Sequence, residues 1–322
     1  MKILFFGSSK FSIPGLKILN KSENIIGVVC QPDKPAGRGL QLKAPLIKEV
    51  ALELKLPVFQ QDSVNTPEFL SKLKTLVPEL IVVVSFGQIL SNEVLNYPKN
   101  SCINLHPSLL PKYRGPAPIQ WAIANGEKTT GVTTIFLIDA VDSGDIMLQR
   151  SVDIKFTDTY EILSERLAEE GAILLKETIG LIKNGNVPRI KQDNSLGTYA
   201  PLLKRFNSAI DWNKSAIEIY NLIRAFNPWP GTFTKLWSGE RRQTINRKLN
   251  DVLIKILEAE TIEKDIVKKP GEIIEIIKGT GLLIATGENC LLIKKIQPAG
   301  KRAMSVDEFL HGHNVKIGGI LK

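Results

Sequence analysis

An amide and an imidazole stand two residues apart in Cys102–His106, a stretch that reads Cys-Ile-Asn-Leu-His. Its apolar residues predict a short strand, and because side chains alternate along a strand, Asn104 and His106 point to the same face. Pro107 then ends the strand, since proline has no N–H to give to a sheet. A hydrogen-bond donor and a proton-transfer group are therefore expected together at the carboxyl end of a strand, where open α/β sheets bind their ligands.

Asp142 is the carboxylate best placed to complete this pair. It lies in a turn marked by Gly144, between Asp139 and Asp145, and this turn lacks the alternating ligands and the closing glutamate of a calcium loop. A carboxylate can orient an imidazole and tune its proton affinity, and an amide can donate to a developing oxyanion. The combination favours a catalytic site over a histidine with a purely structural role.

Other catalytic designs are not supported by the residues present. The remaining two histidines, His311 and His313, lie in a glycine-flanked tail. No Ser or Cys stands in a recognisable nucleophile motif, and the sequence contains no cluster of metal ligands, so no metal is expected. The reaction would therefore take its nucleophile from the substrate.

The segments around these residues alternate between strands and helices. Apolar runs at residues 3–6, 25–30, 80–85 and 132–138 predict strands, and helical spacing predicts helices between them. Such alternation predicts an α/β domain over residues 1–183, with a doubly wound, mostly parallel, Rossmann-like sheet. The first loop carries only one glycine, so the dinucleotide fingerprint is missing and a nucleotide cofactor is not indicated.

The later part of the chain has a different pattern. Residues 184–205 lack a clear period and carry Gly, Pro, Asn and Ser, which predicts a linker between two domains. Residues 206–322 contain five short β-like runs separated by glycine and charged turns. These runs predict a second domain built as a small β-barrel, similar to the oligonucleotide-binding type.

The formal net charge is +9, and most of the excess lies in the later part of the chain. Residues 206–322 carry 18 Lys and Arg against 13 Asp and Glu, whereas residues 1–183 carry 20 against 19. A basic domain beside a nearly neutral one suggests an acidic partner, for which nucleic acid and an anionic membrane are candidates. A generally lysine-rich, solvated surface explains the charge equally well.

Three cysteines, Cys30, Cys102 and Cys290, are far apart and fit neither a disulfide framework nor a zinc site, which indicates a reducing compartment. The apolar run that follows Met1 is too short for the core of a signal peptide. No apolar run reaches the roughly 18 residues of a membrane span. We therefore expect a cytoplasmic protein.

A polar, basic segment rich in glycine and proline, Gln31–Pro45, stands where a connection between strand and helix normally takes about two to six residues. We interpret it as a loop whose cations close over a phosphodiester or another substrate. A surface loop without function is the alternative.

Several motifs together carry a resemblance. Three of them resemble the signature of the folate-dependent formyltransferases, namely Asn104–Pro111, Arg114–Gly115 and Asp142–Gly144. Others resemble the branch of that family that acts on methionyl-tRNA, so that the match covers essentially the whole chain: Gln31–Leu42, Ile210–Trp212, Arg224–Pro230 and Gln297–Lys301. The chain departs from the family pattern at Lys10, where an acidic residue is usual, and at Phe86, where tyrosine is common.

This resemblance implies transfer of a formyl group from 10-formyltetrahydrofolate to the α-amino group of methionine on initiator tRNA, for translation initiation. It also implies that Asn104, His106 and Asp142 are the catalytic residues. Asn104 and His106 would stabilise the tetrahedral oxyanion, while Asp142 would hold His106 and assist proton removal.

Binding residues follow from the same resemblance. The folate donor is expected to contact the first loop and two later loops, through Phe11, Phe86, Gly87, Ile89, Leu90, Ser108, Leu109, Leu110 and Pro111. Initiator methionyl-tRNA is expected to contact Arg38, Lys301 and Arg302, largely through its phosphates. We expect the enzyme to act as a monomer.

Two other functions remain open. A formyltransferase of the same fold could act on a small amine, although a small substrate does not need a basic second domain. The chain could also be an RNA-binding protein whose catalytic half has lost its activity, although Asn104, His106 and Asp142 are all intact. A formylation assay and substitution of His106 distinguish these functions.

Overall fold

The computed structural model describes residues 1–36, 41–237 and 251–322, and it divides into two compact units. The first unit contains Met1–Ile119, Lys128–Ile154 and Glu161–Pro201. The second contains Gln120–Glu127, Lys155–Tyr160 and Leu202–Lys322. Two short segments from the first half of the sequence therefore belong to the second unit.

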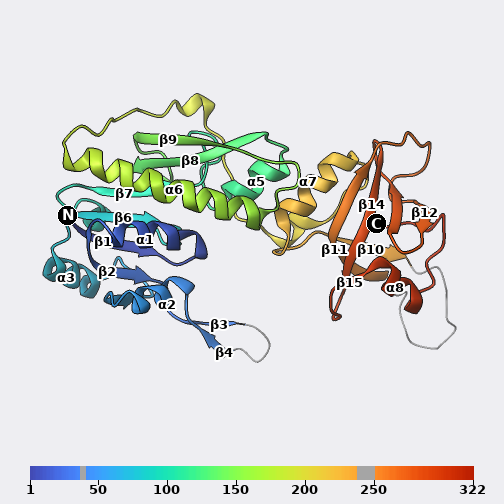
Figure 1. Ribbon diagram of the computed structural model, residues 1–322, viewed down its shortest axis with the longest axis horizontal. Helices are drawn as coiled ribbons and strands as arrows, with labels where there is room; N and C mark the ends of the chain where they lie inside the picture. Colours follow the sequence, from blue (N-terminus) through green and yellow to red (C-terminus); the bar gives the residue numbers. More distant parts are fainter. Residues whose placement is uncertain (37–40, 238–250) are drawn as a thin grey trace. The chain divides into compact units, whose positions relative to one another are not determined.

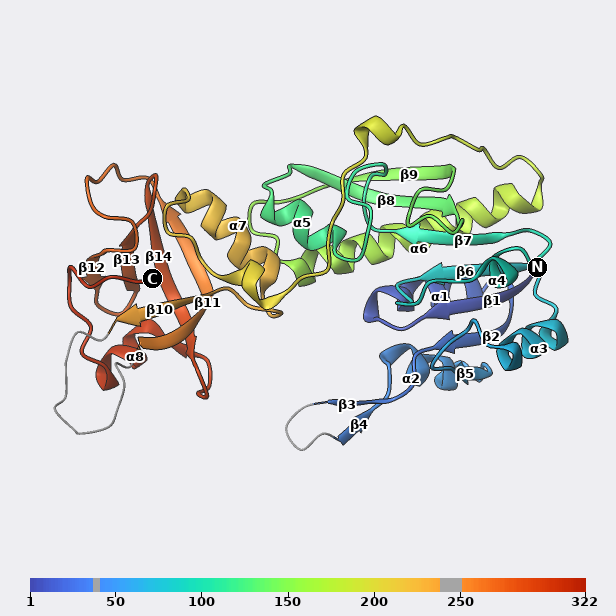
Figure 2. The same ribbon diagram turned by 180° about the vertical axis from the view of Figure 1, so that it is seen from behind.

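A mostly parallel sheet forms the centre of the first unit (Figures 1 and 2). Its strand order is β5-β2-β1-β6-β7-β8-β9. The strands β1, β2, β5, β6 and β7 run parallel, whereas β8 and β9 are antiparallel to their neighbours. The bounds are β1 Lys2–Gly7, β2 Asn24–Cys30, β5 Val58–Gln60, β6 Leu80–Val84, β7 Cys102–His106, β8 Thr129–Phe136 and β9 Ile146–Asp153.

Helices cover both faces of this sheet, which confirms the doubly wound α/β fold predicted from the sequence. On one face lie α1 and α6, because Gly15 in α1 approaches Phe5 of β1 and Gly171 in α6 approaches Leu105 of β7. Helices α3 and α4 pack on the other face in a core that contains Phe6. The helix bounds are α1 Ile13–Asn20, α2 Leu46–Glu53, α3 Pro67–Leu76, α4 Asn92–Leu95, α5 Pro118–Ala124 and α6 Tyr160–Lys183.

The segment Gln31–Pro45 contains a short antiparallel hairpin, where the sequence predicted only a loop. Its strands are β3 Lys34–Ala36 and β4 Gln41–Lys43. Asp33 anchors the base of this hairpin, because its carboxylate accepts hydrogen bonds from Lys48 in α2 and from Gln60 in β5. These two donors, Lys48 first, lower the pKa of Asp33.

An antiparallel sheet with strand order β10-β11-β14-β13-β12 forms the second unit, and β15 pairs with β14. Residues 318–322 connect its two edges: Lys322 exchanges two backbone hydrogen bonds with Lys235 in β10, and Leu321 N donates to the Gly271 carbonyl just before β12. This closure confirms the barrel-like second domain. The bounds are α7 Ala216–Phe226, β10 Phe233–Trp237, β11 Asp251–Ile262, β12 Ile273–Ile277, β13 Gly281–Ala285, β14 Cys290–Pro298, β15 Met304–Ser305 and α8 Val306–Gly312.

Arg224 in α7 explains why residues 155–160 belong to the second unit. Its guanidinium is buried and donates to the main-chain carbonyls of Lys155 and Asp158, while Asn221 accepts from its Nε. A buried cation needs such acceptors, so the segment and the helix stay together. Helix α7 itself begins with a capping box between Ser215 and Glu218.

The compact units differ from the domain boundaries expected from the sequence. Residues 184–205 were expected to form a linker, but the first unit extends through Pro201. Ile190 exchanges two backbone hydrogen bonds with Ile146 of β9, and the Thr198 carbonyl accepts from Arg114 N. Isolated backbone hydrogen bonds hold this segment, and most of it forms neither a helix nor a strand. Its sequence therefore shows no helical or strand period.

None of the helices in the described residues is long and apolar enough to cross a membrane.

All three cysteines are buried, which leads to a prediction about thiol reactivity. Burial raises the pKa of Cys30 to about 11 and also raises the pKa of Cys102 and Cys290. A raised pKa lowers the thiolate fraction near pH 8, and the thiolate is the reactive form. We expect an aromatic disulfide reagent to react slowly with the native chain at pH 8 and with three thiols in denaturant. Rapid reaction of any thiol in the native chain would contradict the buried placement.

Candidate active site

Asn104 and His106 lie on the same face of β7, at the carboxyl end of the strand. Leu105 between them points to the opposite face and packs against Gly171 of α6. Only 8% of Asn104 and 4% of His106 is exposed. Strand alternation therefore places the amide and the imidazole together, at the edge of the sheet where β7 enters its loop.

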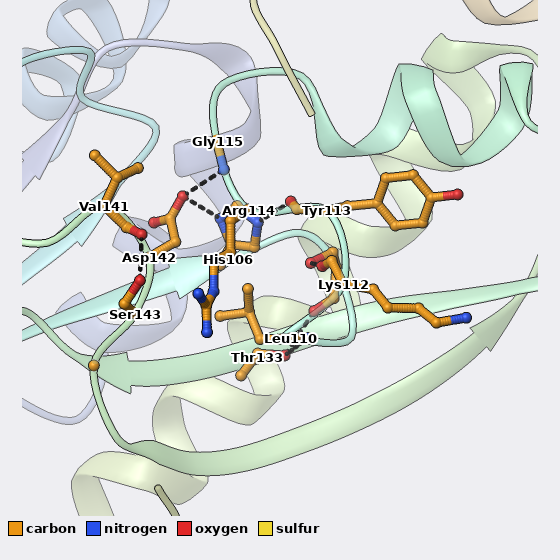
Figure 3. A network of polar contacts seen from close by, with 12 residues as sticks. His106, Leu110, Lys112, Tyr113, Arg114, Gly115, Thr133, Val141, Asp142 and Ser143 are labelled. Carbon is orange, nitrogen blue, oxygen red and sulfur yellow. Dashed lines mark hydrogen bonds and ion pairs between the residues drawn. The ribbon is translucent and has the colours of Figure 1, made fainter. Parts of the chain in front are cut away.

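Asp142 meets His106 from the turn that follows β8. One carboxylate oxygen, Oδ2, lies 3.5 Å from Nδ1 of His106, and the Asp142 side chain is largely buried. Figure 3 shows the carboxylate directed toward both the imidazole and the main chain of Gly115. The structure thus brings together the imidazole and the carboxylate that the sequence separates.

Gly115 holds the carboxylate in place. Its N–H donates to Oδ2 of Asp142 at 2.8 Å. The glycine has a φ of +107°, and a Cβ at this position would approach the Ala200 carbonyl oxygen to 2.9 Å and the Tyr199 ring to 2.7 Å. Because a larger residue would be strained and crowded here, only glycine lets the loop bring its N–H to Asp142.

The second ring nitrogen of His106 determines where its hydrogens lie. Nε2 is 2.9 Å from the main-chain carbonyl of Tyr113, and a carbonyl only accepts, so Nε2 carries a hydrogen. Nδ1 then faces the Asp142 carboxylate, which also only accepts when ionised. At 3.5 Å this contact is longer than a hydrogen bond of about 2.7–3.2 Å, so the carboxylate lies beside the ring without a close hydrogen bond to it.

The Asn104 side-chain amide makes no hydrogen bond to any residue that the structure describes. A nearly buried amide without a protein partner is uncommon, because burial of a polar group is unfavourable unless it is bonded. Its N–H groups can therefore donate to a ligand or to water at the strand end.

The residues predicted to contact the donor differ in exposure. Gly87 and Ile89 are exposed, with 70% of Ile89 accessible, and Leu109 and Pro111 are half-buried. Five side chains are buried: Phe11, Phe86, Leu90, Ser108 and Leu110. The ring of Phe86 packs against Phe6 with centroids 5.0 Å apart, so the ring is not presented to a ligand.

Gln31 and Ser8 support the loop that begins at Phe86, and the sequence did not indicate them. Gln31 Nε2 donates to the carbonyls of Phe86 and Gly87 at 3.1 and 3.4 Å, and Ser8 Oγ donates to the Phe86 carbonyl at 3.1 Å. A Cβ on Gly87 would lie 2.7 Å from Gln31 Nε2. The same glutamine accepts from Lys34, so it connects this loop to the β3–β4 hairpin.

A second pair of side chains supports the loop Ser108–Pro111. Thr133 in β8 donates through Oγ1 to the Ser108 carbonyl at 2.6 Å. Gln149 in β9 donates through Nε2 to the Leu110 carbonyl at 2.8 Å. The antiparallel strands beside β7 therefore set the shape of the loop that follows it.

The predicted tRNA contacts lie apart from these loops in the sequence. Lys301 and Arg302 are exposed in a turn after β14, and Arg302 pairs with Glu308 at 2.5 Å. Arg38 lies outside the described residues.

Lys10 is the residue of the first loop that departs from the family pattern. It pairs with Glu165 of α6 at 2.5 Å, and this hydrogen bond raises the pKa of Lys10. The ion pair therefore balances the charge of Lys10 locally.

No group of three or more His, Cys, Asp or Glu side chains able to hold a metal ion occurs among the residues that the structure describes.

Models of two formyltransferase domains match the chain. The model described as formyl transferase matches residues 1–179, and the model described as formyl transferase, C-terminal domain, matches residues 203–314. The two matches leave residues 180–202 and 315–322 uncovered.

Curated relatives match over their whole length. A methionyl-tRNA formyltransferase from Thermodesulfovibrio yellowstonii is 44% identical over 317 residues, covering 98% of this chain and 97% of the relative. One from Clostridioides difficile is 42% identical over 322 residues, covering 100% of both chains. An N-formyltransferase structure from Helicobacter canadensis, with folinic acid and dTDP-3-aminofucose, shares the fold, with a TM-score of 0.64 at 21% identity over 92% of this chain and 99% of that one. This chain therefore belongs to the formyltransferase family, in the branch of the methionyl-tRNA formyltransferases.

Proposed function

We propose that this chain transfers the formyl group of 10-formyltetrahydrofolate to the α-amino group of methionine carried by initiator tRNA. The observation that carries the proposal is the pair of His106 and Asp142 beside the Asn104 amide. Membership in the methionyl-tRNA formyltransferase branch supports the choice of acceptor. The folinic acid held by the Helicobacter canadensis enzyme supports a reduced folate as donor.

The three side chains have complementary roles in this reaction. The donor supplies an electrophilic formyl carbon; the methionine nitrogen forms the new C–N bond, and the bond from this carbon to the folate nitrogen breaks. Asn104 and His106 donate hydrogen bonds to the oxyanion, and a proton passes from His106 to the departing folate nitrogen as its bond to the formyl carbon breaks. Asp142 orients the ring and takes up the proton that the amine loses.

The loops at the strand ends fit a folate donor. Gly87 and Ile89 offer an exposed, partly apolar surface, and buried side chains hold the neighbouring main-chain groups in place. A pterin needs both a flat apolar contact and main-chain hydrogen bonds. We assign the donor site to Phe86–Leu90 and Ser108–Pro111, together with the buried Phe11.

The second unit supplies the charge for the tRNA. Residues 206–322 carry a net excess of positive residues, 18 against 13, and Lys301 and Arg302 are exposed in one turn. We assign this barrel to tRNA binding, together with Arg38 of the segment Gln31–Pro45. We further propose that the enzyme works as a monomer in the cytoplasm.

A formylation assay with purified components tests this function. We expect efficient formylation of methionine on initiator tRNA and little formylation of free methionine, because the phosphate contacts of the tRNA contribute to binding. The measured quantity is kcat/KM for each acceptor. Equal kcat/KM for both acceptors would assign the chain to the formyltransferases of small amines, and no formylation of either would favour an RNA-binding protein.

Substitution of His106 separates catalysis from binding. We expect His106→Ala to lower kcat by about 10²–10⁴-fold, the usual contribution of a positioned acid or base. The Kd for initiator tRNA should stay near the wild-type value, because the imidazole is buried and does not contact phosphates. The control is His311→Ala, an exposed histidine of the second unit. A His106→Ala enzyme with wild-type turnover would refute the proposed mechanism.

Salt dependence tests the proposed tRNA contacts. We expect Lys301→Ala and Arg302→Ala each to weaken tRNA binding and to reduce the slope of log K against log salt concentration by about 1. Lys316→Ala, an exposed lysine elsewhere in the second unit, is the matched control. Unchanged slopes in both turn variants would remove this turn from the tRNA interface.

A further inference from the structure

Gln192 is a buried side chain in the segment that follows α6. Only 6% of it is exposed, and it belongs to the first unit. Buried glutamine is unusual, since its amide has to find partners for two hydrogens and two lone pairs. Here every partner comes from a segment that lines the proposed active site.

Both hydrogens of this amide are used on one turn. Nε2 donates to the main-chain carbonyl of Asp142 and to that of Gly144, each at 2.8 Å. The oxygen, Oε1, accepts from Arg114 through Nε at 3.1 Å and through Nη2 at 2.7 Å. The side chain therefore joins the carboxylate turn to the loop that contains Arg114 and Gly115.

The turn that Gln192 holds is strained. Asp142 has a φ of +48°, in the left-handed region that a residue with a side chain adopts only when its surroundings hold it there. Gly144 is packed so closely that a Cβ would lie 1.8 Å from the Phe136 carbonyl oxygen. The amide of Gln192 stabilises this conformation by donating to the main-chain carbonyls of Asp142 and Gly144.

Two contacts thus determine where the Asp142 carboxylate lies. The Gly115 N–H bonds the carboxylate itself, and Gln192 bonds the main chain of the same residue. Because Arg114 precedes Gly115 and also bonds Gln192, the two contacts are linked through Gln192. Figure 3 shows Arg114, Gly115 and Asp142 gathered around His106.

We propose that Gln192 is a positioning residue for catalysis, which sets the contact between Asp142 and His106 by holding the turn and the Arg114 loop together. The inference rests on the proposed formyl transfer. It assigns a role in the active site to a residue in the segment that the sequence predicted to be a linker.

The variant Gln192→Glu tests this role. Its side chain has the same shape and still accepts from Arg114, but it has no hydrogens for the Asp142 and Gly144 carbonyls. Since displacement of a catalytic group by about 1 Å can cost on the order of 10²-fold in rate, we expect kcat to fall by about 10²-fold, with little change in KM for the tRNA. Gln192→Asn keeps the donors but withdraws them by one methylene, and it should lose less turnover.

Asn194→Ala is the matched control. Asn194 also accepts from Arg114, at 2.8 Å, but it does not bond the carboxylate turn. We expect this variant to keep the wild-type kcat. A similar loss in Asn194→Ala and Gln192→Glu would show that the packing of Arg114 matters and not the hold on Asp142.

A double substitution tests whether Gln192 acts through Asp142. If it does, Gln192→Glu should lower kcat much less in an Asp142→Asn background than in the wild type. If the losses of kcat in the two single variants multiply in the double variant, the two substitutions act independently and the proposal is overturned. A general loss of stability would give this result.

Nuclear magnetic resonance of the histidine rings gives a readout that does not depend on activity. The chain has only three histidines, so His311 and His313 serve as internal references. We expect Gln192→Glu to shift the ring nitrogen signals of His106 and to leave the other two unchanged. Shifted His106 signals in a chain that formylates no acceptor would support the positioning role while rejecting the proposed function. Unshifted His106 signals together with wild-type kcat would reject the positioning role alone.

Discussion

The structure around the proposed active site depends on one contact, that between Nδ1 of His106 and Oδ2 of Asp142 at 3.5 Å. Neither group can change position alone. The imidazole is fixed by its strand and by the Tyr113 carbonyl, and the carboxylate is fixed by the Gly115 N–H. The Tyr113 carbonyl and the Asp142 carboxylate lie beside the two ring nitrogens, and in the proposed reaction the imidazole supplies the proton that the departing folate nitrogen requires.

The architecture of the sheet explains why this contact forms at the end of β7. Alternation along the strand sends Leu105 to the face under α6 and leaves Asn104 and His106 on the other face. The neighbours β8 and β9 run antiparallel, so Thr133 and Gln149 reach the loop that follows β7 and hold its carbonyls. The strand thus positions the chemistry, and the antiparallel neighbours shape the surface beside it.

Much of this arrangement could be predicted from sequence, and the rest could not, for physical reasons. The Asn104 and His106 pair follows from a strand period of two residues. The turn marked by Gly144 singled out Asp142, and the resemblance to formyltransferases assigned it to the catalytic residues. Gln31 and Gln192 were missed because their amide N–H groups bond main-chain carbonyls, which leave no pattern in the sequence. Ile190 and Thr198 pair with the first unit through backbone hydrogen bonds, and such tertiary pairing cannot be read from a segment without a period.

A crystal structure of this chain with 5-formyltetrahydrofolate is the most direct measurement of the central claim. The account predicts the formyl oxygen within about 3 Å of the Asn104 amide and within reach of His106, with Asp142 still beside the imidazole. A folate bound away from the carboxyl end of β7, or an Asp142 carboxylate turned away from His106 in that complex, would contradict it.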